Sequence, residues 1–444
     1  MDLRQHRQLA RRIFAGAVAA AQPERLLREA VVVEGSLLRI RDDRLPLPRD
    51  RKIHVFGSGK AALGMARGLL DRLGERAGGG LIVVPQGAAR ATLGPLTVIE
   101  GGHPLPDDRS VQAAERMLAA LAALHHEDVF LYLLSGGSSA LLEKPLPPLR
   151  LADLRQLTEL MLRSHVPIEQ INAVRKPLSL VKGGRLGQCT RASGVVLLLS
   201  DVIGDDPGVI GSGPFQGDGS SFAGCRAILQ RAGLWQAVPP AVREVVARGE
   251  SGAIPELPER PRPGIRHVIL GSNRMALAGA RVVATQAGLP SAILTASLEG
   301  EAREVAKVLV AIAESVRDHH EPFAPPICLL CGGETTVTVK GGGRGGRNQE
   351  LALAALQRIG DREGILLLSA GTDGIDGVTT AAGAIADGGY WREGRRLGLS
   401  IDASLQGNDS HRYFRRVGGL VETGPTGTNV MDLVLLIVSP TTQA

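Results

Sequence analysis

The feature that most limits the possible folds is a unit that recurs along the chain: an apolar, β-branched run, then a loop of Gly, Ser and Asp, then a helical pattern. It is clearest in KIHVFGSGKAALGMARGLL at 52–70, DVFLYLLSGGSSALL at 128–142 and HVILGSNRMALAGARVVA at 267–284. Strands that alternate with helices in this way form parallel sheets with crossover helices. We therefore expect an α/β protein in which each of these loops lies at the carboxyl end of a strand.

A chain of 444 residues is too long for one ordinary core. The segment 254–265 carries four prolines, which neither a helix nor a central strand accommodates. We place a linker there and predict an N-terminal α/β domain at 1–254 and a C-terminal α/β domain at 265–444. Both are expected to be Rossmann-like, with a ligand cleft between them, because open α/β sheets bind ligands beyond the carboxyl ends of their strands.

Composition narrows the classes of function. The chain is 44% hydrophobic and 22% charged, as expected of a soluble globular protein, and no apolar run reaches the roughly 18–20 residues of a membrane span. Arg11-Arg12 could begin a secretion signal, but the apolar residues after it recur at helical spacing, so we expect a cytoplasmic protein. The net charge of +6 is spread without a basic tail or aromatic-interleaved patch. We expect small-molecule substrates, no nucleic acid, and a monomer or homodimer.

The loop Gly57-Ser58-Gly59-Lys60 fits neither of two common nucleotide motifs. The next glycine is Gly64, so the G-x-G-x-x-G dinucleotide fingerprint fails, and Ala61 follows the lysine where a phosphate loop needs Ser or Thr. What remains is a lysine at the start of a helix, where a transferring phosphoryl group could bind. A surface lysine after a tight turn is the plainer interpretation.

The loop Ser135-Gly136-Gly137-Ser138-Ser139 allows two interpretations. Its backbone N–H groups could bind an anion, or its Gly-Gly-Ser-Ser-Ala run could be a variant of the nucleophile elbow of serine hydrolases. A triad would need a later Asp and His, and of the histidines that follow only His411 has glycine-rich or hydroxyl-rich neighbours. We favour the anion site, with Ser138 as a hydrogen-bond donor and not a nucleophile.

The segment from Lys340 to Glu350 holds five glycines within six residues around an arginine, followed by helix formers that make Arg347 or Asn348 the expected cap. A flexible hairpin would explain the glycines but not the interleaved cations. Acids gather in two further loops, SDVIGDDPG and GTDGIDG, where their oxygens could bind Mg²⁺ or simply form turns. These acids are Asp201, Asp205, Asp206, Asp373 and Asp376.

Together, these loops resemble the glycerate 2-kinases of the MOFRL class, sometimes labelled hydroxypyruvate reductases, over nearly the whole chain. The motifs that carry the resemblance follow in order: GGHPLPDDRS at 101–110, LSGGSSALLEKP at 134–145, INAVRKPLSLVKGGRLG at 171–187, SDVIGDDPGVIGSGP at 200–214, LGSNRMAL at 270–277, CGGETTV at 331–337, GGRNQELAL at 345–353, AGTDGIDGVTTAAGA at 370–384, NDS at 408–410 and TGPTGTNVMDL at 423–433. One departure is Pro177, where a histidine is expected.

The resemblance implies phosphorylation of D-glycerate at its 2-hydroxyl, with ATP and Mg²⁺, in a cleft between the two domains. Lys60 and Arg347 match the lysine and arginine of the family, and we expect them to approach one ligand from opposite walls. With Asp201 they form the predicted catalytic set. Substrate and phosphate binding is assigned to Ser135, Gly136, Gly137, Ser138, Ser139, Arg175, Lys182, Asn273 and Glu334, and the metal to Asp205, Asp373 and Asp376. A nicotinamide-dependent hydroxypyruvate reductase and a non-catalytic sensor of a small acid are the alternatives.

Overall fold

The structure is a computed structural model that describes residues 2–48, 51–87 and 92–440. The chain divides into two compact units. The N-terminal unit comprises Pro23–Ser200 and Asp205–Leu270, and the C-terminal unit comprises Met1–Gln22, Asp201–Gly204 and Gly271–Ala444. The predicted α/β fold with two Rossmann-like domains is confirmed, although the second sheet is mixed and not purely parallel.

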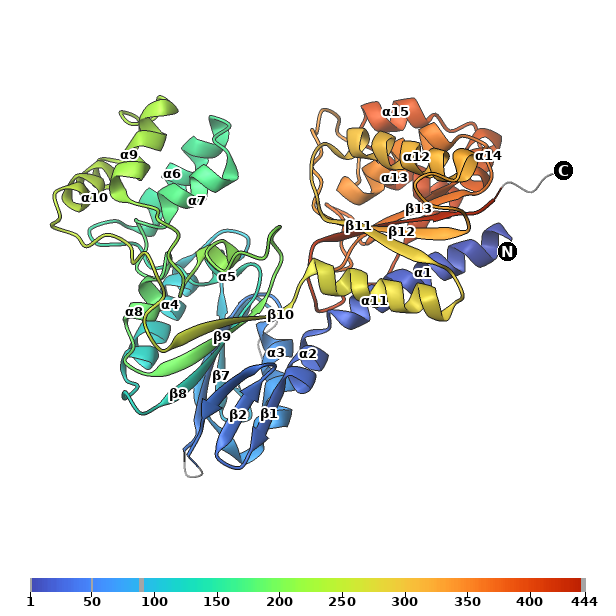
Figure 1. The fold of residues 1–444 in the computed structure, drawn as a ribbon. Coiled ribbons are helices and arrows are strands. Elements are labelled where there is room, and N and C mark those ends of the chain that lie inside the picture. Colours follow the sequence, from blue (N-terminus) through green and yellow to red (C-terminus); the bar gives the residue numbers. More distant parts are fainter. Residues whose placement is uncertain (1, 49–50, 88–91, 441–444) are drawn as a thin grey trace. The chain divides into compact units, whose positions relative to one another are not determined.

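The N-terminal unit is built on a seven-stranded sheet with the order β10-β9-β8-β4-β5-β7-β6. Its strands are β4 (Ile53–Ser58), β5 (Ala77–Pro85), β6 (Thr92–Leu93), β7 (Leu96–Gly101), β8 (Val129–Leu134), β9 (Ser193–Leu199) and β10 (Ile265–Gly271). β9, β8, β4, β5 and β7 run parallel, as the recurring unit predicts. Figure 1 shows α3 (Ala62–Leu73) on one face of this sheet and α4 (Asp108–Ala122) on the other.

Two smaller parts complete this unit. After α2 (Pro23–Ala30) comes an antiparallel sheet of β1 (Val31–Glu34), β2 (Leu37–Ile40) and β3 (Asp43–Pro46). A helical lobe has an apolar core of its own and consists of α6 (Leu151–Arg163), α7 (Ile168–Arg175), α9 (Phe222–Arg231) and α10 (Pro240–Glu250). The short helices η1 (Gly74–Arg76), α5 (Ser138–Leu141), α8 (Arg185–Gln188) and η2 (Ile210–Ser212) lie in the connections.

The C-terminal unit holds a six-stranded sheet with the order β11-β12-β16-β13-β14-β15. The strands are β11 (Ser291–Leu298), β12 (Ile327–Gly333), β13 (Ile365–Gly371), β14 (Gly383–Asp387), β15 (Leu420–Val421) and β16 (Asp432–Val438). β16 runs antiparallel to both of its neighbours, so that Asp432 at its start lies beside Gly333 and Gly371 at their ends. The register therefore gathers the residues that follow β12 and β13 around Asp432.

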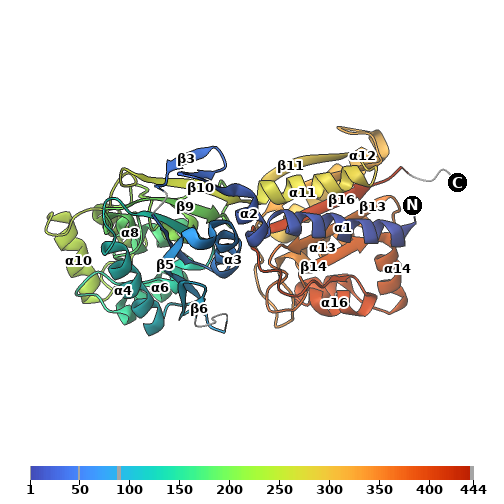
Figure 2. The same ribbon diagram turned by 90° about the horizontal axis from the view of Figure 1, so that it is seen from below.

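Helices cover both faces of this second sheet (Figure 1). α1 (Leu3–Ala20) and α11 (Asn273–Gln286) lie on one face, and Figure 2 shows them side by side. The other face carries α12 (Ala302–His319), α13 (Arg347–Ile359), α14 (Gly388–Arg396), α15 (Ile401–Gln406) and α16 (Ser410–Val417). No helix among the described residues combines the length and the apolar character that crossing a bilayer requires.

The observed division differs from the expected ranges 1–254 and 265–444 in two places. The apolar stripe of α1, which includes Ile13 and Phe14, is buried against α11, so the first helix belongs to the C-terminal unit. The proline-rich segment 254–265 leads into β10, which pairs with β9 and is an edge strand of the first sheet. The chain therefore passes between the units after Leu270 and not within the prolines.

Candidate active site

In the N-terminal unit, two turns at the carboxyl ends of neighbouring strands are bonded to each other. The N–H of Lys60 donates to the carbonyl of Gly136 at 2.9 Å, and the N–H of Ala61 donates to Ser135 Oγ at 3.1 Å. These bonds occupy the buried hydroxyl of Ser135 and leave the Lys60 side chain exposed. The structure therefore brings Lys60 beside the Ser-Gly loop, and the hydroxyl of Ser135 links the two turns.

Ser138 does not face the solvent as a ligand donor would. Its side chain is buried at the start of α5, and its Oγ shares a hydrogen bond of 2.5 Å with Ser58 Oγ, which in turn bonds to Tyr132 Oη at 2.7 Å. The hydroxyl of Ser138 is thus engaged below the loop, and its assignment to substrate binding stays a prediction. The backbone N–H groups of Gly136 and Gly137 and the half-buried Ser139 remain available for an anion.

Lys182 supports the same loop from beneath. Its ammonium group is buried and donates to Ser139 O at 2.8 Å, Leu142 O at 3.3 Å and Glu143 Oε2 at 2.7 Å. These bonds favour a positioning role for Lys182, and its assignment to substrate binding stays a prediction. Burial lowers the pKa of Lys182 to about 8, against the opposing effect of Glu143. Arg175 also approaches Glu143, at 3.5 Å, and keeps 17% of its side chain exposed.

Glu143 is the acid that this arrangement depends on. Its carboxylate is buried and also accepts a hydrogen bond of 2.6 Å from Ser179 Oγ. Burial alone would raise the pKa of Glu143, but the charges of Lys182 and Arg175 hold it below its ordinary value. Sequence analysis missed this residue, although it stands in the quoted motif LSGGSSALLEKP, because nothing in a sequence shows which cation meets an acid 39 residues away.

In the C-terminal unit, Arg347 is the first residue of α13 and already has two carboxylate partners. Its Nε and Nη2 donate to the two oxygens of Asp432 at 2.5 and 3.0 Å, and Nη1 lies 2.7 Å from Glu334 Oε1. Burial alone would lower the pKa of Arg347, but Asp432 and Glu334 raise it, so the guanidinium stays charged. The Arg347 guanidinium, which was predicted to hold a substrate, therefore binds Asp432 in this structure. Sequence analysis did not single out Asp432.

The cap of α13 also differs from the prediction. Gly346, and not Arg347 or Asn348, is the N-cap residue, and no side chain at that position makes the capping bond. Asp376 supplies it instead: its buried carboxylate accepts the N–H groups of Asn348 at 3.0 Å and Gln349 at 2.9 Å, and it also accepts hydrogen bonds from both of their side chains. The oxygens of Asp376 thus serve the helix terminus, and its assignment as a metal ligand stays a prediction.

The other acids divide between the two units. Burial raises the pKa of Glu334, and the positive charge of Arg347 opposes this. Nearby negative charges raise the pKa further, and they belong to Asp432, Asp201 and Asp373. Asp201 is grouped with the C-terminal unit, whereas Asp205 belongs to the N-terminal unit. Among the described residues, no group of three or more His, Cys, Asp or Glu side chains is arranged to hold a metal ion.

Asn273 is a structural residue at the same edge of the second sheet. It begins α11, is buried, and its Nδ2 donates to the carbonyls of Val430 at 2.8 Å and Asp432 at 2.9 Å. These bonds engage Nδ2 only, and the assignment of Asn273 to substrate binding stays a prediction. Asn273 holds the segment that leads into β16 and thereby fixes the carboxylate that binds Arg347.

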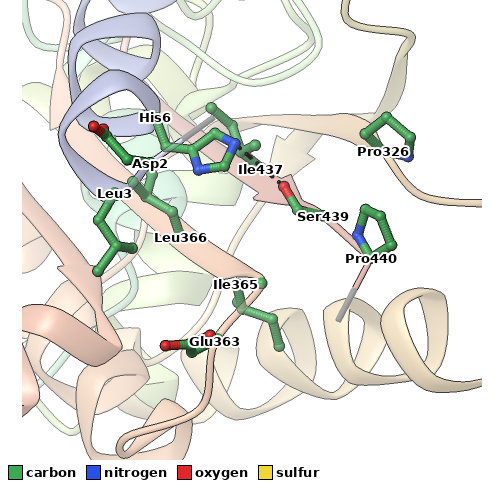
Figure 3. Close-up of a pocket in the computed structure, with 11 residues that line it drawn as sticks. Asp2, Leu3, His6, Pro326, Glu363, Ile365, Leu366, Ile437, Ser439 and Pro440 are labelled. Carbon is green, nitrogen blue, oxygen red and sulfur yellow. Dashed lines mark hydrogen bonds between the residues drawn. The ribbon is translucent and has the colours of Figure 1, made fainter. Parts of the chain in front are cut away.

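The pocket shown in Figure 3, of about 600 Å³, does not belong to this site. It is lined by residues such as His6, Ile365 and Ser439. Ile365 begins β13 and Ser439 follows β16, so the pocket lies at the opposite end of these two strands from Gly371 and Asp432. Neither Arg347 nor any other predicted site residue lines it.

Comparisons with known proteins agree with the motifs. Residues 9–247 match the model of a domain of unknown function named DUF4147, and residues 327–432 match the MOFRL family. A glycerate 2-kinase of Pyrococcus horikoshii is 37% identical over 99% of this chain and 98% of its own length. A D-glycerate 2-kinase of Thermotoga maritima is 37% identical over 94% of this chain and 99% of its own. A relative from Agrobacterium vitis, 38% identical over 97% of this chain and 94% of its own, carries the provisional name hydroxypyruvate reductase.

Solved structures give the same result. A crystal structure of a Pyrococcus horikoshii protein aligns with a TM-score of 0.86 at 37% identity and covers 99% of both chains. A crystal structure of glycerate kinase from Thermotoga maritima aligns with a TM-score of 0.87 at 35% identity and covers 98% of this chain and all of its own. The fold and the order of the loops are therefore shared along the full length.

Proposed function

This chain belongs to the glycerate 2-kinases that carry a MOFRL domain, and we propose from this membership and from its loops that it transfers the γ-phosphoryl group of ATP to the 2-hydroxyl of D-glycerate. The observation that carries the proposal is the full-length similarity to proteins named for this reaction, in a chain whose exposed Lys60 lies beside the turn of Gly136 and Gly137. Phosphoryl transfer depends mainly on positioning and on cations near the phosphate, which these groups supply.

The proposed residues have distinct parts in this reaction. Lys60 stabilises the charge on the transferring group, and the N–H groups of Gly136 and Gly137 bind phosphate or the glycerate carboxylate. Arg175, which is partly exposed, offers a second cation on the same unit. Arg347 orients Glu334, so we assign the arginine a positioning role in the C-terminal unit.

Mg²⁺ is expected to accompany ATP, and the acids of the C-terminal unit fit it in part. Magnesium takes one or two carboxylates and leaves its other positions to water and phosphate, so it needs no complete protein cage. Asp373 and Asp201 would hold it, because their negative charges act together on Glu334 in the same unit. The ion would neutralise charge on the β- and γ-phosphates. Asp205, the third acid predicted for the metal, belongs to the N-terminal unit.

A coupled assay of ADP release tests the proposal directly. With D-glycerate, ATP and Mg²⁺ the protein should release ADP well above a glycerate-free blank, and enolase alone should convert the product to phosphoenolpyruvate. A requirement for phosphoglycerate mutase would show transfer to the wrong hydroxyl. Oxidation of NADH with hydroxypyruvate, without ADP release, would instead support the reductase.

The setting of the enzyme is also proposed. We expect it to act in the cytoplasm, as a monomer or homodimer, with glycerate and ATP as its only partners. Light scattering of the purified protein would measure the mass in solution, to be compared with the 46.6 kDa of one chain.

A further inference from the structure

One histidine close to Lys60 has no part in the site as described so far. His103 lies on the loop between β7 and α4, within the motif GGHPLPDDRS. Its ring is half-buried, and neither ring nitrogen has a hydrogen-bond partner among the residues that the structure describes. A histidine that serves only the core is normally held by such a bond.

The topology brings this ring across the top of the sheet. β7 and β8 are separated by β4 and β5, yet the imidazole of His103 reaches the turn that follows β8. A Cβ atom added to Gly137 would lie 3.2 Å from His103 Nε2 and 3.2 Å from Lys60 Cγ. Gly137 also has a φ of +84°, which favours glycine. The imidazole of His103 and the aliphatic part of the Lys60 side chain thus both lie beside the backbone of Gly137, which is expected to bind the anion.

The charges around His103 favour a neutral ring. Burial lowers the pKa of His103 below its ordinary 6.5, and the positive charge of Lys60 lowers it further. On its own loop, Asp107 is bonded to Arg109, with Nε at 2.9 Å from Oδ2. The turn at 135–139 brings no ionisable side chain. At neutral pH one ring nitrogen is therefore free to accept a proton.

We propose, on the basis of the proposed function, that His103 is the general base that accepts the proton of the acceptor hydroxyl. In this step the O2 atom of glycerate forms a bond to the γ-phosphorus of ATP, and the bond from that phosphorus to the β,γ-bridging oxygen breaks. The O2 proton passes to the free ring nitrogen of His103, and ADP leaves with the bonding pair. His103 then releases the proton to solvent, so that glycerate and ATP yield 2-phosphoglycerate, ADP and one proton.

His103→Gln tests this role, because glutamine retains polarity and size but cannot accept a proton at these pH values. We expect kcat to fall by about 10²–10⁴-fold, the usual contribution of a general base, with KM little changed. Wild-type kcat/KM should fall on the acid side, below about pH 6.5, and the variant should lose that limb. His125→Gln is the matched control, since His125 is exposed on the loop before β8, at the other end of the sheet.

A second measurement needs no variant. NMR titration of ¹³C-labelled histidines in the free wild-type enzyme should give His103 the same pKa as the acid limb of kcat/KM. An active wild-type enzyme whose His103→Gln variant keeps both kcat and the acid limb would overturn the proposal. So would a variant impaired in KM alone, or a His103 pKa that does not match the limb. A wild-type enzyme that releases no ADP with glycerate would refute the proposed function instead.

Discussion

The hydroxyl of Ser138 lies under its loop and bonds to Ser58 Oγ, which in turn bonds to Tyr132 Oη, and this position decides what its loss would do. Ser138→Ala removes one neutral hydrogen bond, which is worth about 0.5–1.5 kcal/mol of the free energy of unfolding. We expect measurable turnover with only modest changes in kcat and KM, because no covalent step uses the hydroxyl. Steady-state kinetics check this, and labelling of Ser138 in the wild-type enzyme by a fluorophosphonate probe would restore the hydrolase interpretation.

The Arg347 guanidinium lies between the carboxylates of Asp432 and Glu334, and only its planar, forked geometry can bind both at once. Lysine in its place cannot bond both oxygens of Asp432 and still reach Glu334. We expect Arg347→Lys to lower kcat/KM at least about tenfold, because each hydrogen bond between charged groups contributes about 1.5–3 kcal/mol and Glu334 loses its orientation.

The matched control for this change is Arg344→Lys on the same glycine-rich loop. Arg344 is exposed, and its side chain makes a single backbone contact, to Val378 O at 3.3 Å. Its kinetics should stay within about twofold of wild type, since an exposed contact of this kind contributes about 0–1 kcal/mol. Equal losses in the two variants would mean that the loop, and not the fork at Arg347, is what matters.

At the scale of elements, the four-residue helix α5 is held by its own turns and by the buried ion pair of Lys182 and Glu143 beneath it. Lys182→Met should destabilise the protein by about 3–5 kcal/mol, because it leaves the Glu143 carboxylate buried without its partner. Urea denaturation measures this. The double variant Lys182→Met/Glu143→Gln should recover part of the loss, and Lys144→Met, at a surface pair with Glu115, should cost less than about 1 kcal/mol. A double variant less stable than the single one would contradict this account.

The same pair predicts a pH dependence. Because the pKa of Glu143 in the folded protein is held below its ordinary value of 4.5, its ionisation stabilises the fold above that pH. That stability is lost as the pH falls through the lower, folded-state pKa. The difference in unfolding free energy between wild type and Lys182→Met should therefore be larger at pH 7 than at pH 4. A difference that widens in acid would show that the carboxylate is not the group that matters.

The elements themselves could be predicted because each is encoded locally. The strand, loop and helix around Lys60 follow one another in sequence, so their order and type can be predicted without knowing which other elements pack against them. The direction in which a loop side chain points cannot be predicted in this way. Lys182 meets a carbonyl 43 residues away and Asp376 caps a helix 28 residues before it, so both point inward for reasons that lie elsewhere in the chain. Sequence analysis therefore located the loops but could not show which of their side chains have partners inside the protein.

At the scale of the whole molecule, the two ends of the chain form one unit. α1 is made first but packs against α11, more than 250 residues later, and the sheet beneath both is completed by β16. A boundary drawn from local composition cannot detect this, because the helical pattern of α1 would suit either unit. It follows that the C-terminal unit cannot be completed until nearly all of the chain is available.

The contact between α1 and α11 depends on a close approach of the two helices, which gives the last prediction. A Cβ atom added to Gly279 would lie 2.3 Å from Ala20 Cβ and 3.0 Å from Gly16 O, and a backbone atom cannot move aside as a side-chain end can. Gly279→Val should therefore push α1 off the sheet and cost about 1–3 kcal/mol or more, as overpacking does. The midpoint of thermal unfolding should shift to lower temperature. Limited proteolysis should cut near residue 22, where the first segment of the C-terminal unit ends. Arg281→Ala, on the exposed side of α11, is the control and should leave both unchanged. If Gly279→Val melts and is cleaved like wild type, α1 is not held to the C-terminal unit by this contact, and the expected range 1–254 would regain its first helix.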